Sequence, residues 1–135
     1  MNKPDCIFCK IVRKEIPATI VHEDSISMSF LDINPVNEGH LLLIPKDHYS
    51  YLVETPDILL KELILRAKNL MKAMKLGLDP EIVVLSVVGK DVAHFHIQLI
   101  PRFPNDGLGG FWPSKKYESI DRMNELRDKI RSFIS

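Results

Sequence analysis

One long helical pattern interrupts a chain of short strand patterns, and this order constrains the fold more than any other feature. Apolar residues recur at helical spacing over residues 56–76, after a Thr55 that can cap a helix, with Pro56 suited to its first position. We expect the helix to end at Gly77. Strands are predicted at 19–23, 27–32, 40–45, 82–88 and 91–102, the last two joined by a tight turn at residues 89–90. Hairpin-length links between neighbouring strands favour an α+β fold with an antiparallel sheet.

The two ends of the chain complete this outline. A short helical turn is expected within residues 5–15, before Pro17, and an amphipathic helix over residues 120–133. Residues 103–116 contain three Gly and two Pro and are predicted to form a loop. At 135 residues the chain has the length of one domain, so residues 1–135 are expected to fold as a single unit.

The composition excludes some classes of function. Lys plus Arg and Asp plus Glu number 18 each, so no strong basic field exists to attract a nucleic acid or an acidic membrane. No apolar run approaches the ~18 residues of a membrane span, and no signal peptide is evident. We therefore expect a soluble cytoplasmic protein that does not bind nucleic acid. Its two cysteines form one CxxC, which by itself fits a metal half-site, a redox pair or two small apolar side chains.

The segment VAHFHIQLIPR, residues 92–102, alternates polar and apolar side chains. On a strand, His94, His96 and Gln98 share one face, each about 7 Å from the next, while the intervening apolar residues face the core. A polar solvated face is one interpretation. Two imidazoles on one face can also bind a metal, transfer protons or attack an electrophile. The pattern alone does not choose among these.

Four segments together resemble the histidine-triad (HIT) superfamily of nucleotidyl hydrolases and transferases. They are CIFCKIVRKEIPA at residues 6–18, FLDINPVNEGHLLLIPKDH at 30–48, VAHFHIQLIPR at 92–102, and the following GGFWP. Their order and spacing match the family over nearly the whole chain. The family hallmark is His-φ-His-φ-His-φ-φ, in which φ is apolar, and here Gln98 replaces the third histidine.

The resemblance implies an enzyme acting on the α-phosphate of a purine-type nucleotide, such as a nucleoside phosphoramidate or a dinucleoside polyphosphate. His96 takes the position of the nucleophile, which forms a nucleotidyl-histidine intermediate. His94 and Gln98 complete the catalytic row, and the Gln98 amide can donate a hydrogen bond to the scissile oxygen but cannot act as an acid. Some relatives with HxHxQ are transferases or phosphorylases, which makes phosphate or another nucleotide an alternative acceptor to water.

The nucleotide-binding positions of the family carry over to Phe30, Asp32, Ile33, Lys90 and Gln98. Asp32 matches the ribose-binding acid, and Phe30 and Ile33 match apolar positions of the base pocket, with a turn Asp and a core Phe as the plain alternatives. His40 matches a histidine that supports the site. Lys90 stands where the family has a phosphate-contacting Gln.

A second departure from the family lies upstream of the hallmark. Counting back from His94 places Val83 at the position of a phosphate-contacting Asn. This loss, together with Lys90, leaves a nucleotide-binding protein with weak or lost catalysis as a further alternative.

The resemblance also implies a structural zinc ion. Relatives with this CxxC hold zinc with two Cys, a His after the central strand and the first hallmark histidine, which correspond here to Cys6, Cys9, His48 and His94. All four are ligands that zinc accepts. A competing interpretation places zinc on His94 and His96 as a hydrolytic centre.

Family members form two-fold dimers through the long helix and a strand, so a homodimer is expected. Trp112 lies in a loop that is unusually apolar. It either packs on its own core or approaches the partner's nucleotide pocket.

Overall fold

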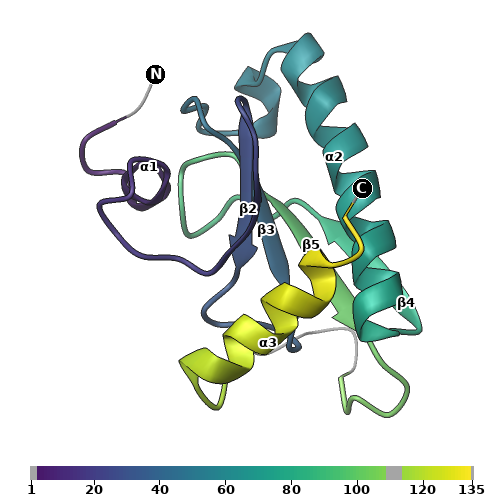
Figure 1. Ribbon diagram of the computed structural model, residues 1–135. Helices are drawn as coiled ribbons and strands as arrows, with labels where there is room; N and C mark the ends of the chain where they lie inside the picture. The colour runs from purple at the N-terminus through teal and green to yellow at the C-terminus, as the bar shows by residue number, and fades with distance from the viewer. Residues whose placement is uncertain (1–2, 109–113, 135) are drawn as a thin grey trace.

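The computed structural model describes residues 3–108 and 114–134, and its centre is an antiparallel sheet (Figure 1). The predicted α+β class is confirmed. The strands stand in the order β1-β2-β3-β5-β4. Their bounds are Ile20–Glu23 for β1, Ser27–Leu31 for β2, Leu41–Pro45 for β3, Ile82–Ser86 for β4 and Ile97–Arg102 for β5.

Helices lie on both sides of this sheet (Figure 1). The long helix α2 (Asp57–Leu78) and the C-terminal helix α3 (Ile120–Arg131) cover one side, and the short α1 (Ile7–Val12) lies on the other. A 3₁₀ turn, η1 (Leu52–Glu54), precedes α2. None of the helices in the described parts of the chain is long and apolar enough to cross a bilayer.

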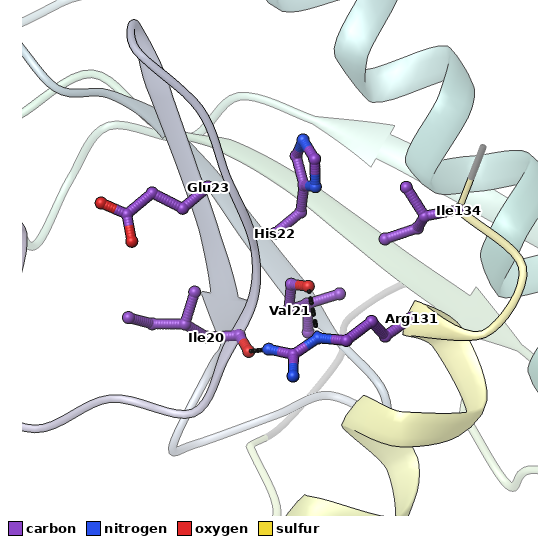
Figure 2. A pocket seen from close by; sticks show the side chains of 6 residues that line it. All are labelled: Ile20, Val21, His22, Glu23, Arg131 and Ile134. Atoms are coloured by element: carbon purple, nitrogen blue, oxygen red, sulfur yellow. Dashed lines mark hydrogen bonds between the residues drawn. The ribbon is translucent and has the colours of Figure 1, made fainter.

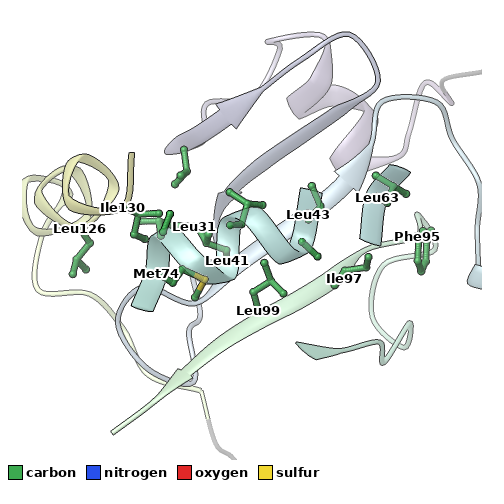
Figure 3. Close-up of a cluster of buried hydrophobic side chains, with 14 residues drawn as sticks. Leu31, Leu41, Leu43, Leu63, Met74, Phe95, Ile97, Leu99, Leu126 and Ile130 are labelled. Carbon is green, nitrogen blue, oxygen red and sulfur yellow. The ribbon is translucent and has the colours of Figure 1, made fainter. Parts of the chain in front are cut away.

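The central strands β2 and β3 are buried on both faces and divide the core into two clusters. On β3, Leu41 and Leu43 pack with α2 and α3 in the larger cluster (Figure 3), while Leu42 and Ile44 pack with α1 in the smaller one. This alternation follows from the period of two along a strand. The smaller cluster faces the candidate functional site.

The long helix α2 forms where it was predicted, but the predictions for its two ends are wrong. The helix continues through Gly77 to Leu78 and ends at Asp79, which adopts the left-handed conformation with φ 53°. A Cβ at Gly77 would lie 2.6 Å from the backbone oxygen of Lys129 on α3. Gly77 therefore permits close helix packing and does not terminate the helix. Thr55 does not cap α2, because its hydroxyl donates to the Tyr51 carbonyl.

The predicted last hairpin is also wrong in detail. The strand β5 begins at Ile97 and not at Asp91, and the connection from β4 spans residues 87–96, with Gly89 at φ 67°. The backbone of residues 94–96 is engaged elsewhere: Phe95 N–H donates to Tyr49 O. His94 and His96 thus stand just before the strand and not on it.

The outer edge of β1 is covered by α3 (Figure 2). Arg131 donates hydrogen bonds to the backbone oxygens of Ile20 and Val21, where a bulge interrupts the pairing with β2. A shallow cavity of about 380 Å³ lies here, lined by β1, Arg131 and Ile134. Trp112 lies outside the described residues.

Candidate active site and metal cluster

A cavity of about 620 Å³ opens between α1, the segment after β2 and the segment before β5. Apolar residues from α1 and β2 form one wall, and titratable and amide side chains converge on the other. Its lining includes Phe8, Phe30, Asp32, His40, His96 and Gln98. An apolar pocket with a few convergent polar groups is the usual form of a small-molecule site.

His96 presents one ring nitrogen to this cavity. Its Nδ1 lies 2.8 Å from the backbone oxygen of His94. Because a carbonyl only accepts, Nδ1 carries the proton and Nε2 carries the lone pair. His96 is 7% exposed and lines this cavity and a second one of about 180 Å³ beside Phe95. The orienting acceptor that a nucleophilic imidazole needs is supplied by the backbone two residues earlier.

His94 is held in the other tautomer, with its proton on Nε2 instead of Nδ1. Its Nε2 lies 2.8 Å from the backbone oxygen of Pro45, so Nε2 carries the proton and Nδ1 carries the lone pair. The Nδ1 atom lies 3.4 Å from Cys6 Sγ and 3.5 Å from Cys9 Sγ. Burial lowers the pKa of His94 to about 4, so the ring is neutral at pH 7.

Cys6, Cys9, His48 and His94 form a cluster whose ligand atoms all lie within 4.8 Å of one another. Cys9 Sγ lies 3.3 Å from His48 Nδ1. A tetrahedral zinc ion with Zn–S of ~2.3 Å and Zn–N of ~2.0 Å separates sulfur from nitrogen by about 3.5 Å. The observed distances therefore fit zinc. The Pro45 carbonyl on His94 is the outer-shell partner that metal-bound histidines usually have.

The two hallmark histidines have different neighbours, because His94 lies in the cluster and His96 does not. His96 is bonded to the His94 carbonyl and is not part of the metal cluster in the described chain. The competing prediction of a hydrolytic metal on both histidines is therefore disfavoured. Burial raises the pKa of the Cys9 thiol, so a bound metal has to displace that proton.

His40 contributes a buried donor that the described residues do not satisfy. Val36 N–H donates to His40 Nδ1 at 3.0 Å, so the proton of the neutral ring is on Nε2. Nε2 is buried without a hydrogen-bond partner in the described chain, 3.7 Å from a carboxylate oxygen of Asp32. Burial lowers the pKa of His40, while Asp32 and Gln98 beside it oppose that shift. A bound ligand with an oxygen acceptor would satisfy this donor.

The other predicted nucleotide-binding residues also line the cavity. Phe30 is buried, Ile33 is 71% exposed at the rim, and Lys90 is exposed. Asp32 accepts the Asn34 N–H at 2.9 Å and keeps its second oxygen near His40. Gln98 stands opposite Leu42 and Ser86 in the sheet, with its side chain in the cavity.

Val83 is the site residue that the structure places elsewhere. It pairs with Pro101 and lies in a groove between β4 and α2, away from the cavity. Counting without gaps misplaced it, because the connection after β4 is irregular. Ser86 is the β4 residue beside Gln98, and cross-strand partners project to the same face. The sequence does not show this pairing register, so it could not identify Ser86 as the neighbour of Gln98.

Phe8 was also missed as a residue of the cavity wall. It stands between the two cysteines and makes edge contacts with Phe30, His94 and His96. An apolar residue inside CxxC was the only signal, and it did not show which segment the ring would meet.

Comparisons with known proteins identify the family that shares this fold. The family model for the HIT domain matches residues 13–105. The chain belongs to the HIT family, which confirms the resemblance seen in the sequence.

Three relatives illustrate this membership. The chain is 45% identical over 106 residues to the HIT-like protein MJ0866 of Methanocaldococcus jannaschii, covering 76% of this chain and 82% of that protein. It is 41% identical over 130 residues to adenosine 5'-monophosphoramidase HNT1 of Saccharomyces cerevisiae, covering 93% of this chain and 80% of that one. The crystal structure of a Zn-bound histidine triad family protein from Mycobacterium smegmatis superposes with a TM-score of 0.85 at 26% identity, covering 96% and 93% of the two chains.

Proposed function

We propose that the protein is a nucleotidyl hydrolase or transferase that attacks the α-phosphate of a nucleotide with His96. The observation that carries this proposal is the His96 ring, which lines a 620 Å³ cavity and whose Nδ1–H is held by the His94 carbonyl, so that the lone pair is on Nε2. The name of the yeast relative, an adenosine 5'-monophosphoramidase, supports this class of substrate.

Nucleotide binding follows from the two walls of the cavity. The base stacks against the apolar wall at Phe8 and Phe30, and the ribose hydroxyls reach the free oxygen of Asp32. The buried Nε2–H of His40 then gains an oxygen acceptor from the ligand. Lys90 at the rim supplies a point charge for phosphate oxygens.

In the first chemical step, His96 Nε2 forms a bond to the α-phosphorus, and the bond to the leaving group breaks. The proton on Nδ1 stays in place, and the His94 carbonyl stabilises the positive charge that develops on the ring. In the second step, water or another acceptor attacks the nucleotidyl-histidine and releases His96. The acceptor's proton passes to the product or to solvent.

Gln98 favours a second version of this chemistry, in which the leaving group and the acceptor are anionic phosphates. Its amide can donate a hydrogen bond to the departing atom but cannot transfer a proton near pH 7. An amine has to be protonated to leave, whereas a phosphate leaves as a stable anion. A phosphorylase or nucleotidyltransferase acting on dinucleoside polyphosphates is therefore the second candidate.

We further propose that Cys6, Cys9, His48 and His94 hold a structural zinc ion. Four protein ligands leave no position open for a substrate, so zinc would supply cross-linking and no reaction step. The metal would tie α1 to the segments after β3 and before β5. Two free thiols favour a reducing compartment such as the cytoplasm.

A homodimer through α2 and β4 is proposed from the apolar surface that these elements expose. Ile64 on α2 and Leu85 on β4 are 45% and 41% exposed. They line a groove of about 490 Å³ beside the free edge of β4. An exposed apolar groove along an unpaired strand edge is a frequent site of association.

A substrate panel tests the proposed function. Adenosine phosphoramidate and a diadenosine polyphosphate are offered with and without inorganic phosphate, to wild type, His96→Ala and the control His22→Ala. The His22 side chain is 40% exposed and lies on β1, outside the cavity lining. Wild type and the control should turn over at least one substrate, and His96→Ala should not. Turnover that requires phosphate favours the second candidate, and no turnover by wild type contradicts both.

A further inference from the structure

We propose that the metal cluster and the nucleotide cavity are coupled through α1, with Phe8 as the positioning residue that joins them. Metal binding would strengthen nucleotide binding, and nucleotide binding would strengthen metal binding by the same factor. This inference rests on the proposed function, because it takes a nucleotide as the ligand of the cavity.

The helix α1 is too short to be stable as an isolated element. The helix has six residues, Ile7–Val12, and its N-cap is Cys6, whose sulfur accepts the Cys9 N–H at 3.3 Å. So short a helix has too few hydrogen bonds to be stable alone. Its position therefore depends on what its side chains contact.

The segment formed by Cys6 and α1 contributes residues to both sites at once. Cys6 and Cys9 belong to the metal cluster, while Ile7, Phe8 and Ile11 line the cavity. The two sets are interleaved within residues 6–11. A movement of α1 changes the metal cluster and the cavity wall together.

Phe8 makes the connection between the two sites most directly. Its ring centroid lies 5.9 Å from that of His94 in the cluster and 5.3 Å from that of His96 in the cavity. A third edge contact, at 5.5 Å, joins it to Phe30 on the apolar wall. The ring is only 7% exposed, so these contacts fix its place.

The metal supplies the anchor that the apolar contacts lack. Thiols are weak hydrogen-bond donors and acceptors, so without a metal Cys6 and Cys9 hold α1 only loosely to His48 and His94. Phe8 and Ile11 then remain as apolar contacts with the smaller core cluster. Ordering α1 before the nucleotide arrives lowers the entropy cost of nucleotide binding.

His94 provides a parallel route that affects catalysis. A metal on its Nδ1 immobilises the residue whose carbonyl orients His96. Phe8 should therefore influence nucleotide affinity, and His94 should influence the rate of attack. Substitution of Phe8 separates the two routes, because it leaves all four metal ligands in place.

The test measures both halves of the coupling with AMP as the probe. Calorimetry gives the Kd of AMP for zinc-loaded and for chelated protein, and competition with a chromophoric chelator gives the Kd of zinc with and without AMP. Couplings between sites typically amount to about 5- to 150-fold, and we expect about 10-fold, equal in the two directions. In Phe8→Ala, zinc should still bind, and the coupling factor should fall toward one.

Val12→Ala is the matched control, because Val12 is on the same helix and packs against the smaller cluster without lining the cavity. It should keep the wild-type coupling factor. Circular dichroism checks that each variant is folded. If the chelated protein unfolds, the coupling is measured only from the Kd of zinc with and without AMP.

The outcomes separate this inference from the function on which it rests. AMP affinity that is equal with and without zinc overturns the coupling and leaves the proposed function intact. A protein that does not bind zinc, or a Phe8→Ala variant with undiminished coupling, also overturns it. Absence of AMP binding in every state contradicts the proposed function itself.

Discussion

Two histidines separated by one residue expose different ring nitrogens because each ring is oriented by a different backbone carbonyl. Pro45 O accepts from His94 Nε2, and His94 O accepts from His96 Nδ1. Nδ1 of His94 is therefore left beside the cysteines, and Nε2 of His96 keeps its lone pair. The proposed separation of metal binding from nucleophilic attack needs no difference in residue type.

Gln98→His tests how the leaving group is handled. The histidine would supply the proton that the Gln98 amide lacks, which is worth about 10²-fold in general acid catalysis. Cleavage of an amine leaving group should rise by this order, and cleavage of a polyphosphate leaving group should change little. Steady-state kcat/KM for the two substrates measures the difference. Equal effects on both would contradict the assigned role of Gln98.

At this scale, the sequence indicated which residues approach the site but not what each one meets. Alternation correctly put His94 and His96 on one side of the chain, since both rings contact Phe8. The partners of His94, however, are Cys6 and Pro45, which lie 88 and 49 residues away in the chain. Only the folded chain determines such contacts.

At the scale of helices and strands, local signals were overridden by packing between elements. A glycine after a long apolar pattern usually ends a helix, yet Gly77 lies inside α2 where the backbone of α3 approaches. The onset of β5 was misjudged because Phe95 N–H pairs with Tyr49 and not with a neighbouring strand. The element types were predictable from periodicity, whereas their ends depended on tertiary contacts.

Gly77→Ala distinguishes these two effects. Helix propensity alone would stabilise the variant by about 1 kcal/mol. The new Cβ, 2.6 Å from the backbone oxygen of Lys129, should instead lower the free energy of unfolding by about 1–3 kcal/mol. Urea denaturation measures the change. Leu76→Ala, at a neighbouring position that is 63% exposed, should stay within about 0.5 kcal/mol of wild type, and a stabilised Gly77→Ala would refute this explanation.

The Asp24 carboxylate stabilises the turn between β1 and β2, and its contribution depends on pH. Burial raises the pKa of this carboxyl, but hydrogen bonds from Ile26 N, Arg66 and Ser27 outweigh it and lower the pKa to about 2. A lowered pKa stabilises the folded state above the unfolded pKa of about 3.9, and the contribution is lost as pH falls toward 2.

Asp24→Ala should therefore cost about 1–2 kcal/mol of unfolding free energy at pH 7. Its difference from wild type should be constant above about pH 5 and shrink toward pH 3. Denaturation at several pH values checks this. A difference that does not depend on pH would show that the carboxylate charge is not involved.

For the whole molecule, the sheet has two unlike edges. Arg131 of α3 occupies backbone oxygens at the β1 edge, whereas β4 is open beside an apolar groove. Association through β4 is therefore expected, and association through β1 is not.

Leu85→Lys tests the proposed dimer. The groove is already lined by Lys68, Lys72 and Lys75, so a further positive charge should be unpaired there and should convert the protein to monomers at concentrations where wild type is dimeric. Light scattering coupled to size-exclusion chromatography gives the mass. Ile120→Lys, on α3 at a position 71% exposed, should remain dimeric. A monomeric wild type would contradict the dimer.

The central claim is that His96 carries the nucleotide during turnover, and mass spectrometry of the quenched reaction tests it most directly. Protein stopped during turnover of a nucleotide substrate is digested, and the peptide that contains residues 92–102 is examined. We predict a nucleotidyl group on His96 in wild type and none on the same peptide of His96→Ala. Full turnover by His96→Ala, or a nucleotidyl group on another residue, would contradict the account.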